Sequence, residues 1–315
     1  MITLLIRRTL LGFATLIVTL VLIFLMVRLL PGNPAAVLLR DDASPEQVAY
    51  INELWGLNEP IPQQFLIYVG NLLRGDAGDS FQYQSTAGSP GTPAIGLVLS
   101  RVPATIELAV VSILISVAVA VPLGILTALR RDTVLDHATT TSALLLGSLP
   151  NFWIGMQLIL LFGVILGILP TSGAGTPQHV ILPAVTLAIP FMVVMLRLTR
   201  TEVARVLRAE YITTARAKGL KGNTILVRHA LRNAMIPLVT VMGLRLGGLL
   251  NGAVVVETLF GWPGVGRLMI DAIDARDYPL IQVLVPFSAV VFVIINISVD
   301  VIYGFLDPRV KVGAT

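Results

Sequence analysis

Long apolar runs that hold almost no charge constrain this chain more than any other feature of its sequence. The hydrocarbon layer of a bilayer is about 30 Å thick, and a helix needs about 20 apolar residues to cross it. Only 13% of the residues are charged, against about 25% in a typical soluble protein, so a soluble core could not enclose this much apolar surface. We therefore predict an all-α, polytopic membrane protein. Its six transmembrane helices are expected at about residues 9–29, 104–128, 140–168, 181–199, 234–256 and 281–305.

Most of the 22 Lys and Arg residues fall on one side of these helices, the side that carries both termini. Loops on the cytoplasmic side of membrane proteins are enriched in Lys and Arg. We expect cytoplasmic N- and C-termini, an extracytoplasmic segment at 30–103 and a cytoplasmic loop at 200–233, within one transmembrane domain over 1–315. The same preference explains the net charge of +4, so no nucleic-acid partner is expected.

Two amphipathic helices are predicted in the extracytoplasmic segment. In the first, Ser44 caps the helix, Pro45 occupies its first position and Gly56 ends it. The second covers the sequence PQQFLIYVGNLLRG, which ends at Gly75. Its apolar residues recur at the spacing of one helix face: Phe65, Tyr68, Val69, Leu72 and Leu73. Residues 84–93 have the composition of a flexible loop.

Prolines inside the predicted spans mark candidate kinks, because proline removes a backbone donor and clashes with the preceding turn. The alternative is that proline is simply more frequent in membrane helices than in soluble ones. The prolines concerned are Pro122, Pro150, Pro183, Pro190, Pro237 and Pro286.

Motifs of known enzyme classes are absent from the sequence. His137, His179 and His229 lie far apart, and no H-E-x-x-H or G-x-S-x-G pattern occurs. The chain has no cysteine, and it lacks the Gly-Lys pair that a phosphate-binding loop requires. We expect a chain that is not an enzyme and that binds no metal or cofactor. Any ATP-driven work must then be done by another chain.

Ionisable residues inside a membrane span are costly unless they are paired or face water. Arg245 lies in the middle of the fifth predicted span, and Glu257 lies near its outer end. Both are candidate residues of a translocation pathway. The alternative for Arg245 is a structural pairing with a neighbouring helix or with a partner subunit.

The stretch TTARAKGLKGNTILVRHALRNAMIP, residues 213–237, concentrates positive charge between two apolar runs. We expect a helix over 202–218, a corner at Gly219 and Gly222, and a second helix that Asn223 caps and that runs into the fifth span. A solvated loop that only sets topology would explain the charge. It would not explain the small residues beside the corner, which allow close packing against another protein: Thr214, Ala215 and Ala217.

At this stretch the sequence resembles the inner-membrane permease subunits of binding-protein-dependent ABC importers. Their cytoplasmic motif is Glu-Ala-Ala, three residues, Gly, and a later Pro, and the matching positions here are Thr213, Thr214, Ala215, Gly219 and Pro237. The first two residues and the longer gap before proline depart from the general motif, in the way that the dipeptide, oligopeptide and nickel branch does. Further stretches resemble that branch: LPGNPA, RVPATIELA, GSLPNFWIG, GAVVVETLFGWPGVGRLMIDAIDARDYPLIQ and LDPRV. Asn33 stands where the branch more often has Asp.

The resemblance implies the type I importer transmembrane fold, in the bacterial cytoplasmic (inner) membrane. It implies that this chain is the first permease of a pair, with a second homologous permease, two ABC ATPase subunits that use ATP and Mg, and an extracytoplasmic substrate-binding protein. Short peptides are the implied cargo, with nickel or other small solutes as the alternative. A self-contained carrier or channel remains a second hypothesis. The residues implied to couple the chain to an ATPase are Thr213, Thr214, Ala215, Arg216, Ala217, Lys218, Gly219 and Leu220.

Overall fold

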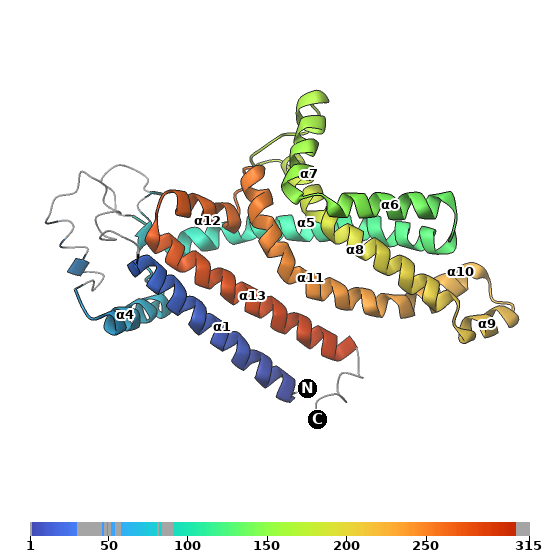
Figure 1. Ribbon diagram of the computed structural model, residues 1–315, viewed down its shortest axis with the longest axis horizontal. Coiled ribbons are helices and arrows are strands. Elements are labelled where there is room, and N and C mark those ends of the chain that lie inside the picture. The colour runs from blue at the N-terminus through green and yellow to red at the C-terminus, as the bar shows by residue number, and fades with distance from the viewer. Residues whose placement is uncertain are drawn as a thin grey trace. The chain divides into compact units, whose positions relative to one another are not determined.

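The computed structural model describes residues 2–29, 58–80, 82–83 and 91–306, together with four single positions between 46 and 53. The described chain is helical apart from β1 (Asp79–Ser80) and β2 (Thr92–Pro93), which pair antiparallel (Figure 1). The helices, in chain order, are α1 (Ile2–Leu29), α4 (Ile61–Arg74), α5 (Ala94–Leu129), α6 (Val134–Ser148), α7 (Asn151–Leu158), η1 (Ile159–Ile165), η2 (Pro177–Val180), α8 (Ile181–Leu207), α9 (Glu210–Ala217), α10 (Gly222–Thr224), η3 (Ile225–Leu231), α11 (Arg232–Leu259), α12 (Val265–Asp274) and α13 (Tyr278–Leu306). The predicted all-α class is confirmed.

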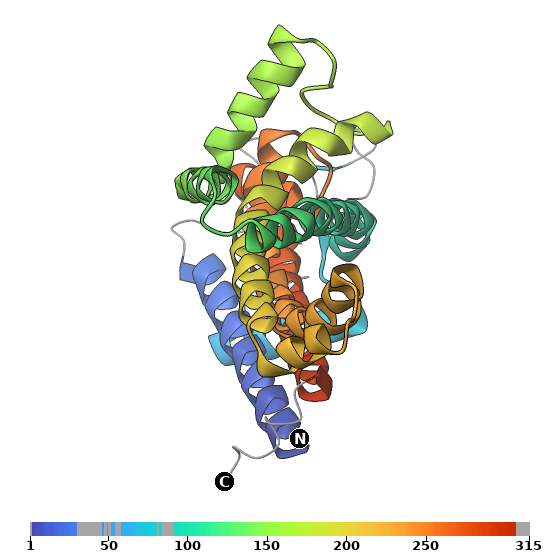
Figure 2. The same cartoon turned by 90° about the vertical axis from the view of Figure 1, so that its right-hand side faces the viewer.

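Five helices of the described chain are long and apolar enough to cross a bilayer, and a bent pair makes six if it counts as one span. The bent pair replaces the third predicted span, 140–168. Its two parts, α6 and the α7–η1 segment, meet at an angle of 106°. Leu149, which precedes Pro150, has an extended backbone because the proline ring disfavours helical geometry in the residue before it. Figures 1 and 2 both show α7 leaving the direction of α6.

The other prolines within predicted spans do not end their helices. Pro122 lies inside α5, Pro190 inside α8, Pro237 inside α11 and Pro286 inside α13. Pro183 lies in the first turn of α8, where no intrahelical hydrogen bond is lost. Of the candidate kinks, Pro150 is the one that the structure turns into a break between helices.

The chain divides into two compact units, whose boundaries fall inside α5 and α13. The first unit contains Ile106–Trp262 and the chain from Ile295 onward. The second contains Ile2–Thr105 and Pro263–Ile294.

Small residues on α5 let α8 pack closely against it in the first unit. Gly124 lies so near α8 that an added Cβ would be 2.6 Å from Thr199 Cβ and 2.9 Å from the Leu196 carbonyl oxygen. One turn before Gly124, Ala120 is fully buried. Two turns before Gly124, Ser116 Oγ donates a hydrogen bond to the Ala188 carbonyl oxygen of α8 at 3.0 Å. Membrane helices associate through such close contacts, since lipid tails supply no hydrophobic drive between helices.

An apolar cluster joins α8 to α5, α6 and α11, and Ala120 of α5 belongs to it. Phe191, Met195 and Leu196 are buried together with Leu238 of α11 and Ala143 of α6. α8 thus forms the centre of the first unit, with α5, α6 and α11 around it (Figure 2).

The second unit is held by aromatic and aliphatic contacts between α1, α4 and the first part of α13. Phe24 of α1 meets Phe65 edge to face at 5.3 Å and stacks on Tyr68 at 6.0 Å between ring centroids. The Tyr68 hydroxyl donates to the Gln282 carbonyl oxygen at 2.8 Å. α4 is the second amphipathic helix that the sequence predicts, and it ends at Gly75 in the left-handed conformation as expected.

A short polar contact fixes the β1 strand on the start of α13. The Ser80 hydroxyl donates to the Asp277 carboxylate, and the Leu280 N–H donates to the same carboxylate at 3.2 Å. Burial raises the pKa of Asp277. The helix predicted to start at Ser44 and the loop predicted at 84–93 lie mostly outside the described residues.

We predict that Gly124→Ala destabilises the protein, because the new methyl group would meet the backbone of α8. Overpacking of this kind costs about 1–3 kcal/mol. Gly70→Ala is the matched control, since its Cβ position meets no described atom within 4 Å beyond its chain neighbours and its own helix backbone, and alanine favours a helix by about 1 kcal/mol. Thermal unfolding of both purified variants in detergent measures the difference. Equal melting temperatures would contradict close packing of α5 on α8.

Candidate coupling site

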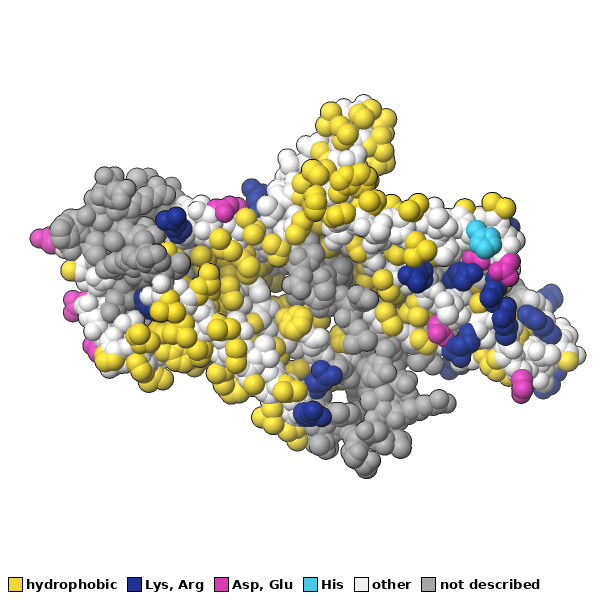
Figure 3. Space-filling model, viewed as in Figure 1, with side chains coloured by type: hydrophobic (Ala, Val, Ile, Leu, Met, Phe, Trp, Pro, Cys, Tyr) yellow, Lys and Arg dark blue, Asp and Glu magenta, His cyan; other side chains and the backbone are white. Residues whose placement is uncertain are grey.

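Positive charge gathers on one end of the first unit, over α9 and α10 and the adjoining ends of α6 and α8 (Figure 3). The exposed basic residues there are Arg130, Arg131, Arg197, Arg205, Arg208, Arg216, Lys218, Lys221, Arg228 and Arg232. An excess of Lys and Arg over Asp and Glu on a surface that borders two apolar spans matches the topological preference for Lys and Arg. This end contains the predicted loop at 200–233.

The predicted continuous helix over 202–218 is wrong. α8 ends at Leu207, and α9 begins at Glu210 after Ala209 adopts an extended backbone. The N–H of Ala209 still bonds to the Val206 carbonyl oxygen at 3.0 Å, so α8 ends in a tight turn. Neither proline nor glycine stands at this point, so the sequence carries no breaker signal for the turn. Glu210 in the first turn and Arg216 in the last suit the helix dipole of α9.

Gly219 forms the corner that the sequence predicts. Its φ of +76° lies in the left-handed region that favours glycine. The Gly219 N–H bonds to the Arg216 carbonyl oxygen at 2.9 Å, and the Leu220 N–H bonds to the Ala215 carbonyl oxygen at 3.3 Å. This pair of bonds is the Schellman arrangement, which satisfies the last carbonyls of a helix.

The second half of the predicted corner differs from the expectation. Gly222 is the first residue of α10 and does not separate two helices. Asn223 lies inside α10, so the predicted cap at Asn223 is wrong. Lys221 precedes the helix in an extended conformation. The chain then continues through the π-helix η3 into α11 without a gap.

The coupling segment, defined here as α9, α10 and η3 (Glu210–Leu231), packs as a single hairpin. Ile212 and Ala215 of α9 are buried against Ile225 at the start of η3. The Asn233 side-chain amide donates to the Tyr211 hydroxyl oxygen at 2.8 Å, which joins α9 to the first turn of α11. α9 is thus packed on η3 and hydrogen-bonded to α11.

The predicted coupling residues lie in α9 and in the corner that follows it, and they differ in burial. Ala215 faces inward, where it helps to hold the hairpin together. The others are exposed: Thr213, Thr214, Arg216, Ala217, Lys218, Gly219 and Leu220. Tyr211 of α9 and Leu220 after it are 43% and 40% exposed, so the segment offers apolar as well as cationic contacts.

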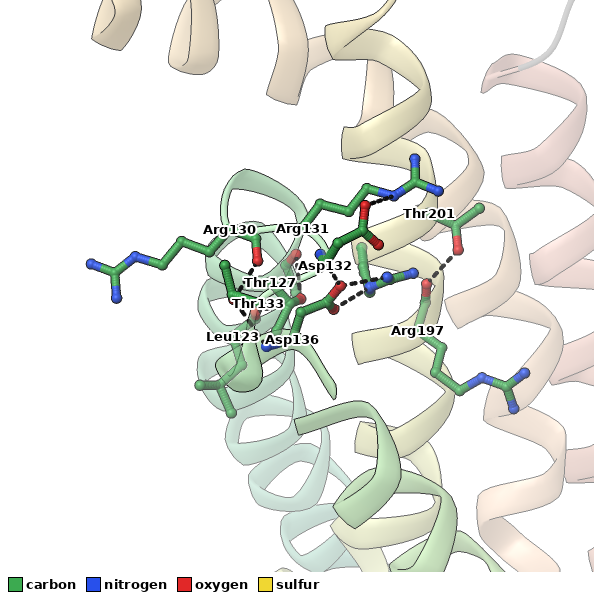
Figure 4. Close-up of polar contacts among 11 residues, drawn as sticks. Leu123, Thr127, Arg130, Arg131, Asp132, Thr133, Asp136, Arg197 and Thr201 are labelled. Atoms are coloured by element: carbon green, nitrogen blue, oxygen red, sulfur yellow. Dashed lines mark hydrogen bonds and ion pairs between the residues drawn. The ribbon is translucent and has the colours of Figure 1, made fainter. Parts of the chain in front are cut away.

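A partly buried ion pair ties the start of α6 to α8 (Figure 4). Arg200 Nε and Nη2 donate to the two oxygens of Asp136, at 2.5 and 2.7 Å. Asp136 is only 1% exposed. Two parallel N–H···O bonds to one carboxylate make a directional contact that fixes both side chains.

The α5–α6 turn is shaped to hold Asp136 in place. The Asp132 N–H donates to Asp136 Oδ2 at 3.0 Å, and Asp132 itself has a φ of +60°. The Thr133 hydroxyl donates to the Arg130 carbonyl oxygen at 2.6 Å (Figure 4), and its oxygen caps α6 by accepting from the Asp136 N–H. Thr133 and Asp136 form a capping pattern that is readable in the sequence. The partner Arg200 lies 64 positions further on, and sequence spacing gives no sign of it.

The candidate pathway residues are both in α11. Glu257 lies in its last turns and is fully buried, with the Trp262 N–H bonded to its backbone carbonyl oxygen at 2.8 Å. Gly155 of α7 lies close to the C-terminal end of α11, where a Cβ added at Gly155 would lie 2.5 Å from Leu259 Cδ2. The side chain of Arg245 lies outside the described residues. A pathway role for either residue stays a prediction.

Five to six apolar spans, together with a packed hairpin between α8 and α11, define a multi-pass membrane permease. The chain belongs to the family described as binding-protein-dependent transport system inner membrane component, whose model matches residues 120–312. Residues 1–109 match the model for the N-terminal part of such membrane components. The predicted family and the bacterial inner-membrane location are therefore confirmed, and the family is a permease of ABC importers, not an enzyme.

Curated relatives match nearly the whole chain. The oligopeptide transport system permease protein AppB of Bacillus subtilis (strain 168) is 37% identical over 316 residues, which cover 97% of this chain and 98% of the relative. The glutathione transport system permease protein GsiC of Escherichia coli (strain K12) is 39% identical over 306 residues, with the same coverage of each chain. GsiC of Salmonella choleraesuis (strain SC-B67) is 40% identical over 297 residues, which cover 94% and 95%.

A solved chain of the MetNI methionine ABC transporter shares the fold. Its TM-score is 0.56 at 18% identity, and the match covers 68% of this chain and 98% of that chain. The likeness confirms the predicted type I importer transmembrane fold.

We predict that Arg200→Met lowers the stability of the protein much more than Arg205→Met does. The first change leaves the buried Asp136 carboxylate without its partner, which costs about 3 kcal/mol. Arg205 pairs with Glu202 at the surface, at 2.6 Å with 64% of its side chain exposed, so its loss costs less than about 1 kcal/mol. The two residues lie five positions apart on one helix. Thermal unfolding in detergent compares the melting temperatures of the two variants. A similar decrease in both would contradict a special role of the pair between Asp136 and Arg200.

Proposed function

We propose that this chain forms half of the translocation pathway of an ATP-driven importer of short peptides. The observation that carries the proposal is that relatives covering 94–97% of the chain are named oligopeptide and glutathione permeases. Glutathione is itself a short peptide, so these names share one cargo class. They favour peptides over nickel, and family membership argues against a self-contained carrier or channel.

The proposal assigns ATP hydrolysis to partner subunits. The sequence lacks a Gly-Lys phosphate loop, and the family works with a binding protein and an ATPase. We propose that two ABC ATPases use ATP and Mg beneath the membrane, that a second homologous permease completes the pathway, and that a binding protein delivers the peptide from outside. This chain then needs no cofactor of its own.

The coupling segment supplies the mechanical link in this proposal. An ATPase that holds the exposed face of α9 pulls on Ile225 through Ile212 and on α11 through the contact between Tyr211 and Asn233. Because α8 leads directly into α9, and α8 is tied to the α5–α6 turn by Asp136 and Arg200, the pull reaches three helices of the first unit. Rigid elements that move together are the physical requirement for switching access from one side to the other.

We predict that Gly219→Val abolishes peptide uptake by the assembled importer while membrane insertion stays normal. Valine strongly disfavours a φ of +76°, so the corner after α9 could not close. Gly222→Val is the matched control, because it has no positive φ and no described atom lies within 4 Å of its Cβ position. ATP-driven uptake of radiolabelled trialanine into proteoliposomes measures the effect. Uptake by the Gly219→Val complex at the wild-type rate would overturn the proposed coupling.

We also predict that residue 214 faces the cytoplasm and residue 73 faces the outside. The chain has no cysteine, so a single introduced cysteine is the one thiol a maleimide can reach. Leu73 is 83% exposed and Thr214 is exposed, which makes both positions accessible to reagent. In intact spheroplasts, an impermeant maleimide should label Leu73→Cys and should label Thr214→Cys only after permeabilisation. The reverse pattern would invert the topology and remove the coupling proposal.

The same reconstitution separates the importer from a self-contained carrier. Proteoliposomes with this chain alone should take up no trialanine, whereas the complete complex with ATP should. Transport down a gradient by the isolated chain would favour the carrier.

A further inference from the structure

A cavity of about 270 Å³ lies in the second unit, where the first turns of α5 meet the start of α12. Tyr83, Arg101, Arg267 and Asp271 contribute polar side chains to its lining. Two guanidinium groups therefore border one small cavity together with a single carboxylate. The coupling segment and the candidate pathway residues are not part of this cavity.

The cavity lining has two arginines and one carboxylate, so its formal charge is positive. Asp271 Oδ2 lies 3.7 Å from Arg267 Nε, and the Tyr83 hydroxyl donates to the same oxygen at 3.5 Å. Both contacts are longer than strong charge-assisted hydrogen bonds, which measure about 2.7–2.9 Å. Among the residues that the structure describes, Arg101 forms no ion pair. A further anion can thus be accepted without displacing any ion-pair partner of Arg101 that the described chain provides.

The remaining polar groups at the cavity also suit an anion. α12 begins beside Gly264, and its first turn carries the partial positive charge of a helix N-terminus. The Val265 N–H donates to Thr105 Oγ1 at 2.9 Å, which fixes this turn against α5. Burial and the nearby Asp271 raise the pKa of Tyr83, so its hydroxyl keeps its proton and can donate.

We propose that this cavity binds the C-terminal carboxylate of a short peptide, with Arg101 as its main contact. The planar fork of a guanidinium matches the two oxygens of a carboxylate, and every unmodified linear peptide carries that group at its end. The volume lies below the range of about 300–1,000 Å³ that encloses a drug-sized ligand, so the cavity fits the end of a peptide and not a whole oligopeptide. This inference rests on the proposed peptide cargo and deepens it, because it names the group on the peptide that the permease recognises.

Binding of trialanine to the full chain in phosphatidylcholine nanodiscs tests the inference. Equilibrium dialysis would compare radiolabelled trialanine, its C-terminal amide and its N-acetyl form. We expect saturable binding of trialanine, binding at least about tenfold weaker for the amide, and no loss for the N-acetyl form, which keeps the carboxylate. Equal affinities for the acid and the amide, or an absence of saturable binding, would overturn the inference.

Variants assign the effect to the cavity. Arg101→Gln should weaken trialanine binding about tenfold, and Arg101→Lys should weaken it less because the charge stays. Arg74→Gln is the matched control, since Arg74 is an exposed arginine of α4 that does not line this cavity. Unaltered affinity in Arg101→Gln would rule out the site. If that variant fails to fold, the comparison of acid with amide on the wild-type chain still decides.

Uptake by the complete importer separates this inference from the proposed function. ATP-driven uptake of trialanine by a complex whose permease does not distinguish acid from amide would defeat the carboxylate site alone. If the complex takes up no di- or tripeptide, the proposal that short peptides are the cargo is wrong, and the inference fails with it.

Discussion

Backbone groups inside a bilayer must find their hydrogen-bond partners within the chain, and the rest of this structure depends on that constraint. Helices meet it, so the described chain is almost entirely helical. Helices in lipid must then be held together without a hydrophobic drive. α5 and α8 solve this through Gly124 and Ser116, which bring one backbone against the other. Bulkier residues at these positions would separate the two helices.

Two side-chain pairs link helices around the coupling segment. Asp136 and Arg200 join the α5–α6 turn to α8, and Asn233 and Tyr211 join α9 to α11. These pairs fix the turns around the coupling segment, so that its helices move as one body. In the second unit, Ser80 and Asp277 fix β1 on the start of α13 in the same way. If the coupling segment transmits force as proposed, these paired side chains contribute to the rigidity it requires.

The sequence predicts features that depend on composition or on one residue. Apolar runs reveal the spans, and the stop of α4 at Gly75 and the corner at Gly219 follow from the conformational freedom of glycine. Prediction from the sequence fails where a feature is caused by residues that are distant along the chain or has no local sequence signal. The break at Ala209 carries no local signal, and Arg200 meets Asp136 only because α6 returns along α8. The coupling residues were predicted as one group because a motif does not tell which face of a helix packs inward, as Ala215 does.

The length of α5 has a consequence for the outer part of the protein. At 1.5 Å per residue its 36 residues extend over about 54 Å, far more than the hydrocarbon layer of about 30 Å. Tilting alone cannot absorb the excess, because membrane helices rarely lean beyond about 40°. Several turns of this rod must therefore stand among headgroups or in water. If the excess lies at the N-terminal end of α5, Arg101 on its third turn stands in this polar zone, where a charged side chain adds little to the cost of insertion.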